Sequence, residues 1–238
     1  MEIEKLPIIG RIVALFEVLL CSDYPTQLAV GSTLAAFGVR PVAAGGGLSL
    51  RFIVGLSLID TAMLVGLIVL LIRSHGERVR DVLLGSRSVA REVEFGVPLT
   101  IGALAIAVAV VAGLQHFVPA LHNVPSNPLQ DVIHGPRQAA LFALVVVIAG
   151  GVREEIQRAF LLHRFNVWLG GPIVGLVVSS LAFGAGHLLQ GRDVSIATAL
   201  LGLYWGVIYL RRRSCIGPMV SHSGFNLMEV LLYFVRGR

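Results

Sequence analysis

The sequence predicts an all-α protein, a polytopic bundle of transmembrane helices, and two observations lead to this prediction. Of the 238 residues, 55% are hydrophobic and only 14% are charged, and the mean hydropathy is +0.83. A typical soluble domain carries about 25% charged residues. Apolar runs also recur as far as the C-terminus, which excludes a secretory signal followed by a soluble domain. We therefore expect residues 1–238 to form a single integral membrane domain, multi-pass in the cell (inner or plasma) membrane.

Six apolar runs are long enough to cross about 30 Å of hydrocarbon, which takes about 20 helical residues. They lie at residues 52–72, 97–118, 138–162, 172–189, 194–210 and 215–235. Two weaker apolar stretches, 7–21 and 27–48, precede them within residues 1–50, and the second is interrupted by Arg40-Pro41 and three glycines. Each of these two spans the membrane, re-enters it or lies on its surface. The sequence thus predicts six membrane helices and up to eight.

Arginines in the loops predict the orientation of the bundle. Five arginines lie between residues 73 and 92, and three more lie at 211–213. Loops rich in Lys and Arg stay cytoplasmic, and alternation of the six spans places these two loops on the same side. Residues 77–92 are also predicted to form an interfacial helix, and the proline-rich segment 119–136 a structured external loop. This distribution explains the pI of about 9.9 without a nucleic-acid partner, and we predict none.

The segment AGGVREEIQRAFLLHRF at 149–165 places four charges within six positions: Arg153, Glu154, Glu155 and Arg158. Each charge at a helix centre costs roughly 2.5–3.5 kcal/mol of insertion free energy, so these side chains must face water or one another. Helical spacing lets the Arg158 guanidinium reach either glutamate. Arg153 points elsewhere and is predicted to snorkel to the interface. An ion pair that holds two helices together is the alternative to a functional site.

Two later spans carry polar side chains that strengthen the functional reading. His187 follows Phe183 by four residues, and His222 and Asn226 lie four apart on one helix face. An acid, two imidazoles and an amide inside a membrane indicate a functional site. Counted at about 1.5 Å per residue from the cytoplasmic ends, Glu154 and His222 lie about 12–15 Å deep and His187 about 22 Å deep. A tilt, a kink or different helix ends must close this gap if the groups meet.

These residue types suit hydrolysis without a covalent nucleophile. A carboxylate beside an imidazole can remove a proton from water, and an imidazole and an amide one turn apart can donate hydrogen bonds to an oxyanion. Glu154, His187 and His222 could also ligate zinc, although the HExxH motif is absent, and the metal stays open. No Gly-x-Ser-x-Gly motif occurs, so a serine hydrolase is not expected.

The remaining polar and aromatic residues have simpler interpretations. Asp60 is predicted to make a helix–helix hydrogen bond, and Glu229 to pack rather than to line a cavity with His222. His163 and Arg164 are predicted to lie at the interface. Three aromatic residues are assigned to an interfacial belt or to packing: Trp168, Tyr204 and Trp205.

The chain resembles the CPBP family: the type II CAAX prenyl endopeptidases and their bacterial relatives, some linked to bacteriocin processing or immunity. Three motifs within residues 150–230 carry the resemblance: EEIQR at 154–158, FGAGH at 183–187 and HSGFN at 222–226. The resemblance implies that Glu154 activates water with His187. It also implies that His222 and Asn226 stabilise the oxyanion and that Glu155 and Arg158 support Glu154. Family members are often labelled metalloproteases, and a metal-free glutamate-activated water has also been proposed.

One departure from the family pattern affects the choice of base. The usual family pattern is EExxxR, whereas in this chain the arginine comes one position earlier and position 159 is Ala. The guanidinium therefore leaves the helix at another angle, and the choice between Glu154 and Glu155 stays open.

The leading hypothesis is an intramembrane endopeptidase that cleaves a peptide or a membrane protein near the membrane surface, on the cytoplasmic side. A prenylated CAAX substrate is implied by the resemblance alone. A non-enzymatic membrane partner, such as an immunity protein, is the second hypothesis, and a proton or cation pathway is the third. The partners expected in each case are the lipid bilayer and a peptide or protein, with no nucleic acid.

Overall fold

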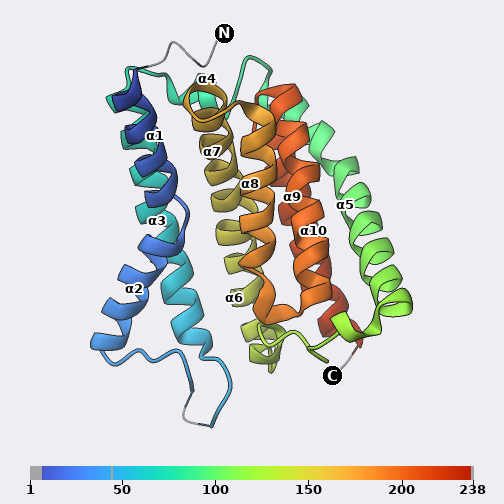
Figure 1. Cartoon of the computed structure of the whole chain (residues 1–238). Helices are drawn as coiled ribbons and strands as arrows, with labels where there is room; N and C mark the ends of the chain where they lie inside the picture. Colours follow the sequence, from blue (N-terminus) through green and yellow to red (C-terminus); the bar gives the residue numbers. More distant parts are fainter. Residues whose placement is uncertain (1–6, 44, 237–238) are drawn as a thin grey trace.

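The computed structural model describes residues 7–43 and 45–236, and the predicted all-α bundle is confirmed over these residues (Figure 1). Among the described residues, Val42 and Leu48 form an isolated antiparallel β-bridge. The main helices are α1 Ile8–Leu20, α2 Tyr24–Ala36, α3 Leu50–Ser74, α4 Val79–Leu83, α5 Val89–Phe117, α6 Pro136–Val145, η4 Val146–Arg153, α7 Glu154–Trp168, α8 Pro172–Ala185, α9 Arg192–Arg212 and α10 Ile216–Arg236. Short 3₁₀ turns at Pro119–Leu121, Gln130–Val132 and Leu188–Gln190 complete the described structure.

Three helices of the described chain are long and apolar enough to cross a membrane: α3, α5 and α9. They coincide with the predicted spans at 52–72, 97–118 and 194–210. α5 begins eight residues earlier than predicted, because the Ser88 side chain caps its first turn by accepting a hydrogen bond from the Arg91 N–H. α10 packs against α5, and α8 packs against α9.

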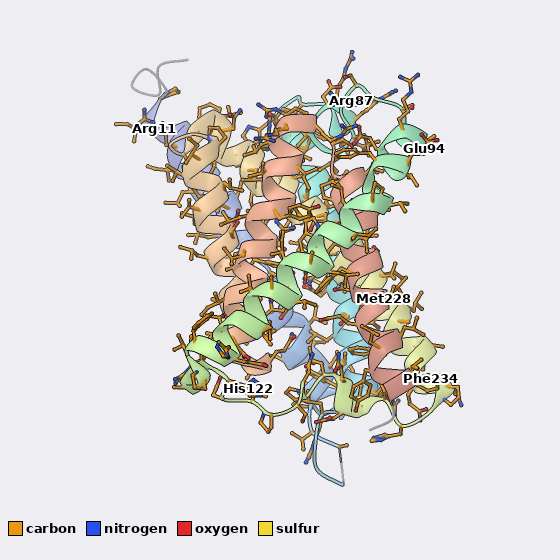
Figure 2. The ribbon with its side chains drawn as sticks, turned by 90° about the vertical axis from the view of Figure 1, so that its right-hand side faces the viewer. Arg11, Arg87, Glu94, His122, Met228 and Phe234 are labelled. Carbon is orange, nitrogen blue, oxygen red and sulfur yellow. The ribbon has the colours of Figure 1, made fainter. Side chains whose placement is uncertain are left out.

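The two ends of the bundle carry different loops. Arg87 and Glu94 lie at one end and His122 lies at the other (Figure 2). We call the first the arginine-rich end and the second, which carries the loop at 118–135, the proline-rich end. The single interfacial helix predicted at 77–92 is wrong: this range holds the short helix α4 and, from Val89, the start of α5, and Val82 and Leu83 of α4 are buried. The Tyr209 hydroxyl donates to the Val82 carbonyl at 2.8 Å, which ties α4 to α9.

The first two helices follow one another between the two ends of the bundle, and each has 13 residues (Figure 1). At about 1.5 Å per residue each is about 20 Å long, so neither crosses the hydrocarbon alone. Residues 21–23 separate them, and Asp23 has a φ of 79°, which a right-handed helix does not contain. The interruption predicted within the stretch 27–48 agrees with the structure, because α2 stops at Ala36 and a loop follows.

The span predicted at 138–162 is not one continuous α-helix. Val146–Arg153 forms a π-helix between α6 and α7, a geometry that is rare and frequent at functional sites. Two glycines in this segment allow α10 to approach: a Cβ at Gly151 would overlap with Ser223 Oγ, and one at Gly150 would lie 2.5 Å from Asn226 Nδ2. The π-helix and its glycines therefore set the face that Glu154 and Glu155 present to α10.

The helix ends close the expected gap in depth between Glu154 and His187. α7 continues to Trp168, so Glu154 lies about 21 Å along the helix from that end. α8 stops at Ala185, and His187 lies in the turn beyond it, about 22 Å from Pro172 by the same count. The predicted boundaries at 162 and 189 are wrong, and with the observed ones the two residues reach similar depths.

A buried ion-pair cluster joins α1, α7 and residues 75–78 toward the arginine-rich end. Arg164 is fully buried, with Nε donating to Glu17 and NH1 to Glu77, each at 2.6 Å. His163 contacts Glu77 at 2.5 Å, and His75 contacts Glu17 at 2.6 Å. The interfacial assignment of Arg164 is therefore wrong. Trp168 packs against α1 as predicted, because it fills the space beside Gly10.

Glu77 makes this cluster sensitive to pH. Burial raises the pKa of the Glu77 carboxyl, but hydrogen bonds from His163 and Arg164 outweigh it, and the net pKa lies below the ordinary value. The folded state therefore gains stability from ionised Glu77 above the unfolded-state pKa of about 4.3, and loses it as the pH falls through the lower folded-state pKa. We expect the melting temperature in detergent to fall with acidification less steeply for Glu77→Gln than for wild type. Glu94→Gln, which neutralises an exposed glutamate (Figure 2), is the matched control, and equal slopes for all three proteins would contradict the assignment.

Candidate active site

Glu155 lies at the centre of a buried ion-pair triad. Its Oε1 accepts from Arg158 NH1 three residues later and contacts His222 Nδ1 of α10 at 2.9 Å. The Glu155 side chain is 1% exposed. The sequence left open which glutamate Arg158 reaches, and in the structure it binds Glu155. Because Glu155 accepts from both partners, its carboxylate is held in place and faces away from solvent.

Glu154 occupies a different environment. Its side chain is 17% exposed, and its Oε1 accepts from Arg153 NH2 at 3.3 Å. Its Oε2 lies 3.8 Å from His222 Nε2. Glu154 therefore has one oxygen against a guanidinium and the other facing an imidazole across a gap longer than a hydrogen bond.

His187 presents a free nitrogen to the same region. Its Nδ1 contacts the Phe183 carbonyl oxygen at 2.8 Å, and because a carbonyl only accepts, Nδ1 carries the proton. In the neutral ring Nε2 is then unprotonated and can accept one. The end of α8 at Ala185 creates this arrangement, since the turn at residues 186–187 lets the ring fold back onto the last helical residues.

Asn226 is held one turn after His222. Its Nδ2 donates to the Val146 carbonyl of the π-helix at 3.1 Å, which occupies one of two amide hydrogens. The serines beside His222 have other partners: Ser221 Oγ accepts from Trp205 Nε1 at 3.0 Å, and Ser223 packs against Gly151. Of these three residues of α10, Asn226 is therefore the one whose side chain retains a donor for a ligand.

Aromatic rings fix both imidazoles. The Trp205 indole stacks on His222 with ring centroids 3.9 Å apart and planes at 16°. Phe183 contacts His222 and His187 edge-on, at 5.9 and 4.9 Å, and Arg158 lies 4.5 Å over the Phe183 ring. The assignment of Trp205 to belt or general packing is therefore too coarse, because it orients a site imidazole. Tyr204 donates to the Leu99 carbonyl at 3.0 Å, which is a packing role as predicted.

Arg153 belongs to the site, contrary to its predicted place at the interface. It is 5% exposed and does not snorkel. Its NH1 donates to Asp23 and to Asp60 Oδ2, the latter at 2.9 Å, and its NH2 donates to Glu154. The predicted helix–helix contact of Asp60 is confirmed, and its partner is this guanidinium. Nothing in the spacing of the sequence points to Asp23, because its link to Arg153 joins residues 130 positions apart.

Two cavities meet at Glu154 and His187. The first, of about 290 Å³, lies between the α1–α2 break, α7 and the end of α8. The second, of about 440 Å³, lies among α3, α5, α6, η4, α9 and α10 and includes His222, Asn226 and Glu229 in its wall. Glu229 therefore lines a cavity, contrary to its packing interpretation. The residues that line both cavities are Gln27, Leu129, Arg153, Glu154, Phe183, His187 and Gln190.

The cavities adjoin the proline-rich end. Leu129 of the loop at 118–135 and Gln190 beside it line both of them. None of the described lining residues comes from the arginine-rich loops at 73–92 or 211–213. The expectation of a site on the cytoplasmic side, where the arginine-rich loops are predicted to lie, is therefore wrong within that orientation.

Glu154, His187 and His222 do not form a metal site in the described structure. No group of three His, Cys, Asp or Glu side chains among residues 7–43 and 45–236 is arranged to hold an ion. His187 Nδ1 and His222 Nδ1 are engaged by Phe183 and Glu155. The Nε2 atoms of both imidazoles are therefore the ring nitrogens that remain open to a ligand.

Comparison with known proteins identifies the segment that contains this site. Residues 136–228 match the family model described as Rce1-like, type II CAAX prenyl endopeptidase. This segment is therefore similar to the CPBP family of intramembrane proteases. No curated protein and no solved structure matches the chain.

The family match agrees with the resemblance seen in the sequence and fixes the class of chemistry. The chain is a CAAX-protease-like endopeptidase, a hydrolase of peptide bonds. The matched segment of this protease runs from the start of α6 into α10 and contains Arg153, Glu154, Glu155, His187 and His222. Asp23 and Asp60 lie outside it, so the N-terminal helices add groups to the site that the match does not cover.

Proposed function

We propose that the protease hydrolyses a peptide bond within the membrane by a water molecule that Glu154 and His187 activate. The observation that carries this proposal is that two adjacent glutamates lie in different environments. Glu155 is enclosed by Arg158 and His222, whereas Glu154 faces both cavities. A general base must reach its substrate water, so Glu154 is the base and Glu155 is a support.

The hydrogen bonds of the imidazoles give them different roles. Nε2 of His187 is an acceptor and can hold the hydrogen of the attacking water beside Glu154. Nδ1 of His222 donates to Glu155, so Nε2 of His222 is a donor in the doubly protonated ring. His222 Nε2 and the second hydrogen of Asn226 Nδ2 then donate to the oxyanion of the tetrahedral intermediate.

The reaction follows from these roles. Glu154 takes a proton from the water while the water oxygen attacks the peptide carbonyl carbon. His222 and Asn226 stabilise the resulting oxyanion. Glu154 then passes the proton to the leaving nitrogen as the carbon–nitrogen bond breaks. The peptide enters from the proline-rich end, because the cavities adjoin that end. A membrane peptide or protein is the substrate class, and neither cavity identifies a prenyl group.

Cleavage of membrane-peptide libraries by the purified protein in detergent or liposomes tests this function. A general base typically contributes about 10²–10⁴-fold to the rate. A single oxyanion donor typically contributes about 10²–10³-fold. We therefore expect His187→Ala and His222→Ala each to lower kcat by about 10²-fold or more while the melting temperature stays measurable. Thr33→Ala, which removes an exposed hydroxyl that donates to the Ala29 carbonyl within α2, is a control for folding.

Two further arms separate the alternatives. Absence of cleavage by the wild type, together with a cellular function that survives in both histidine variants, would favour the non-enzymatic membrane partner. Proton flux into liposomes that depends on Asp60 would favour the ion pathway. Incubation with a chelator is expected to leave the rate unchanged, because the described side chains present no three-ligand site. Activity that is lost with a chelator and restored by zinc would contradict a mechanism in which the water is activated without a metal.

A further inference from the structure

The break between α1 and α2 carries a carboxylate into the site. Asp23 stands at the N-cap of α2, where aspartate usually accepts from an N–H of the first helical turn. Its side chain makes no such cap bond. It instead pairs with Arg153 NH1, and it lines the cavity of about 290 Å³. Non-helical backbone at membrane depth is tolerated where it lines a cavity, and here the break also delivers a charge.

The backbone at Asp23 is strained in a way that agrees with a functional role. A φ of 79° is uncommon for a residue other than glycine, and Asp and Asn are the residues that best tolerate it. Such strain persists where surrounding contacts over-determine it. Gln27 Nε2 donates to Asp23 Oδ2 at 2.5 Å, and Gln157 Nε2 of α7 donates to the Cys21 carbonyl at 2.8 Å. The break is thus held both to α2 and to the helix that begins with Glu154.

Arg153 connects the break to Glu154. Its guanidinium is planar and rigid, so the groups that fix NH1 also fix the direction of NH2. NH1 is held by Asp23 and Asp60, and Nε donates to the Ala149 carbonyl at 3.2 Å. The remaining nitrogen, NH2, then rests against Glu154 Oε1. This leaves Glu154 Oε2 toward His222 and the cavities.

We propose that Asp23 is a positioning residue for the reaction, acting through Arg153 to hold Glu154 in its productive orientation and to limit the positive charge that Glu154 meets. This inference rests on the proposed role of Glu154 as base. It makes the N-terminal broken helix, which lies outside the matched segment at 136–228, part of the catalytic apparatus.

The charge balance around Glu154 predicts a pH signature. The charged and titratable groups facing it come from the break, α3, η4, α7, the turn after α8 and α10: Asp23, Asp60, Arg153, Glu155, Arg158, His187 and His222. Removing the charge of Asp23 leaves Arg153 less compensated, which favours the ionised form of Glu154 and weakens it as a base. The acid limb of the rate profile should move to lower pH, and the maximal kcat should fall.

The decisive variant is Asp23→Asn, because Asn keeps the shape of the side chain and tolerates positive φ. We expect kcat to fall about tenfold with KM within about twofold of wild type, and the acid limb to shift to lower pH. Glu94→Gln, which removes an exposed carboxylate, should match wild type. Asp23→Gly relieves the backbone strain but also lacks the carboxylate, so it should lose as much kcat as Asp23→Asn.

A double-mutant cycle with Arg153→Lys tests the route through Arg153. If Asp23 acts through this guanidinium, the two substitutions are non-additive in kcat and in the free energy of unfolding. Wild-type kcat in Asp23→Asn, full activity in Asp23→Gly, a change confined to KM, or additive effects would each overturn the inference. Cleavage by wild type that is abolished in Glu154→Gln establishes the proposed function separately, and the unfolding cycle needs no cleavage at all.

Discussion

Glu154→Gln is expected to reduce peptide cleavage by at least about 10³-fold while leaving the protein folded. Gln has nearly the same shape as Glu but does not take a proton from water, so the loss is that of a general base. Because the Glu154 side chain partly faces a cavity and its contact to Arg153 is 3.3 Å, its neutralisation removes little folding energy. Initial rates and thermal unfolding in the same detergent measure the two effects.

Glu155→Gln is the matched comparison, since it makes the same chemical change one residue away. Glu155 is buried against Arg158 and His222, so its neutralisation leaves a buried guanidinium with a weaker partner and lowers the melting temperature more than Glu154→Gln does. The remaining activity should exceed that of Glu154→Gln, because His222 keeps its indole stack on Trp205. An inactive, stable Glu155→Gln beside an active Glu154→Gln would reverse the assignment of the base.

Arg158→Met is expected to have the largest effect on stability. Removing one member of a buried ion pair typically costs about 3–5 kcal/mol of folding free energy, because the other charge is left without compensation. Arg158 is 4% exposed, pairs with Glu155 and lies over the rings of Phe183 and Trp205. Reversible unfolding in mixed detergents measures the change.

Two controls show whether this cost arises from the uncompensated charge. The double variant Glu155→Gln/Arg158→Met removes both charges and should recover most of the lost stability, since replacing a whole buried pair is often nearly neutral. Arg91→Met removes an exposed arginine and should be within about 0.5 kcal/mol of wild type. A double variant no more stable than Arg158→Met would show that Arg158 stabilises the fold by its packing instead of its pairing with Glu155.

The sequence located the helices and the site motifs because both depend on local patterns. Apolar runs of about 20 residues require helices in a bilayer, and α3, α5 and α9 lie where those runs predicted them. The helical periodicity also put His222 and Asn226 on one face, and both line the larger cavity. The costs of four charges in an apolar segment correctly pointed to mutual contacts among them.

The errors have a common physical origin in contacts between distant residues. Arg153 looked like a snorkelling charge, because its partners Asp23 and Asp60 lie on helices far away in the chain. Arg164 looked interfacial, because Glu17 and Glu77 are equally distant. The π-helix at Val146–Arg153 and the early end of α8 at Ala185 also depend on neighbouring helices: α10 approaches at Gly150 and Gly151, and α9 at Gly184.

The sequence by itself determined that the chain is a membrane helical bundle with an acid, two imidazoles and an amide on its later helices. Only the tertiary structure decided which glutamate faces the cavities, which nitrogen of each imidazole is free, and which aspartates hold Arg153. The physical reason is that hydrophobicity and helical period act within one segment. The orientation of a buried charged side chain, by contrast, is set by the partners that neighbouring helices bring to it, as Arg158 and His222 bring theirs to Glu155.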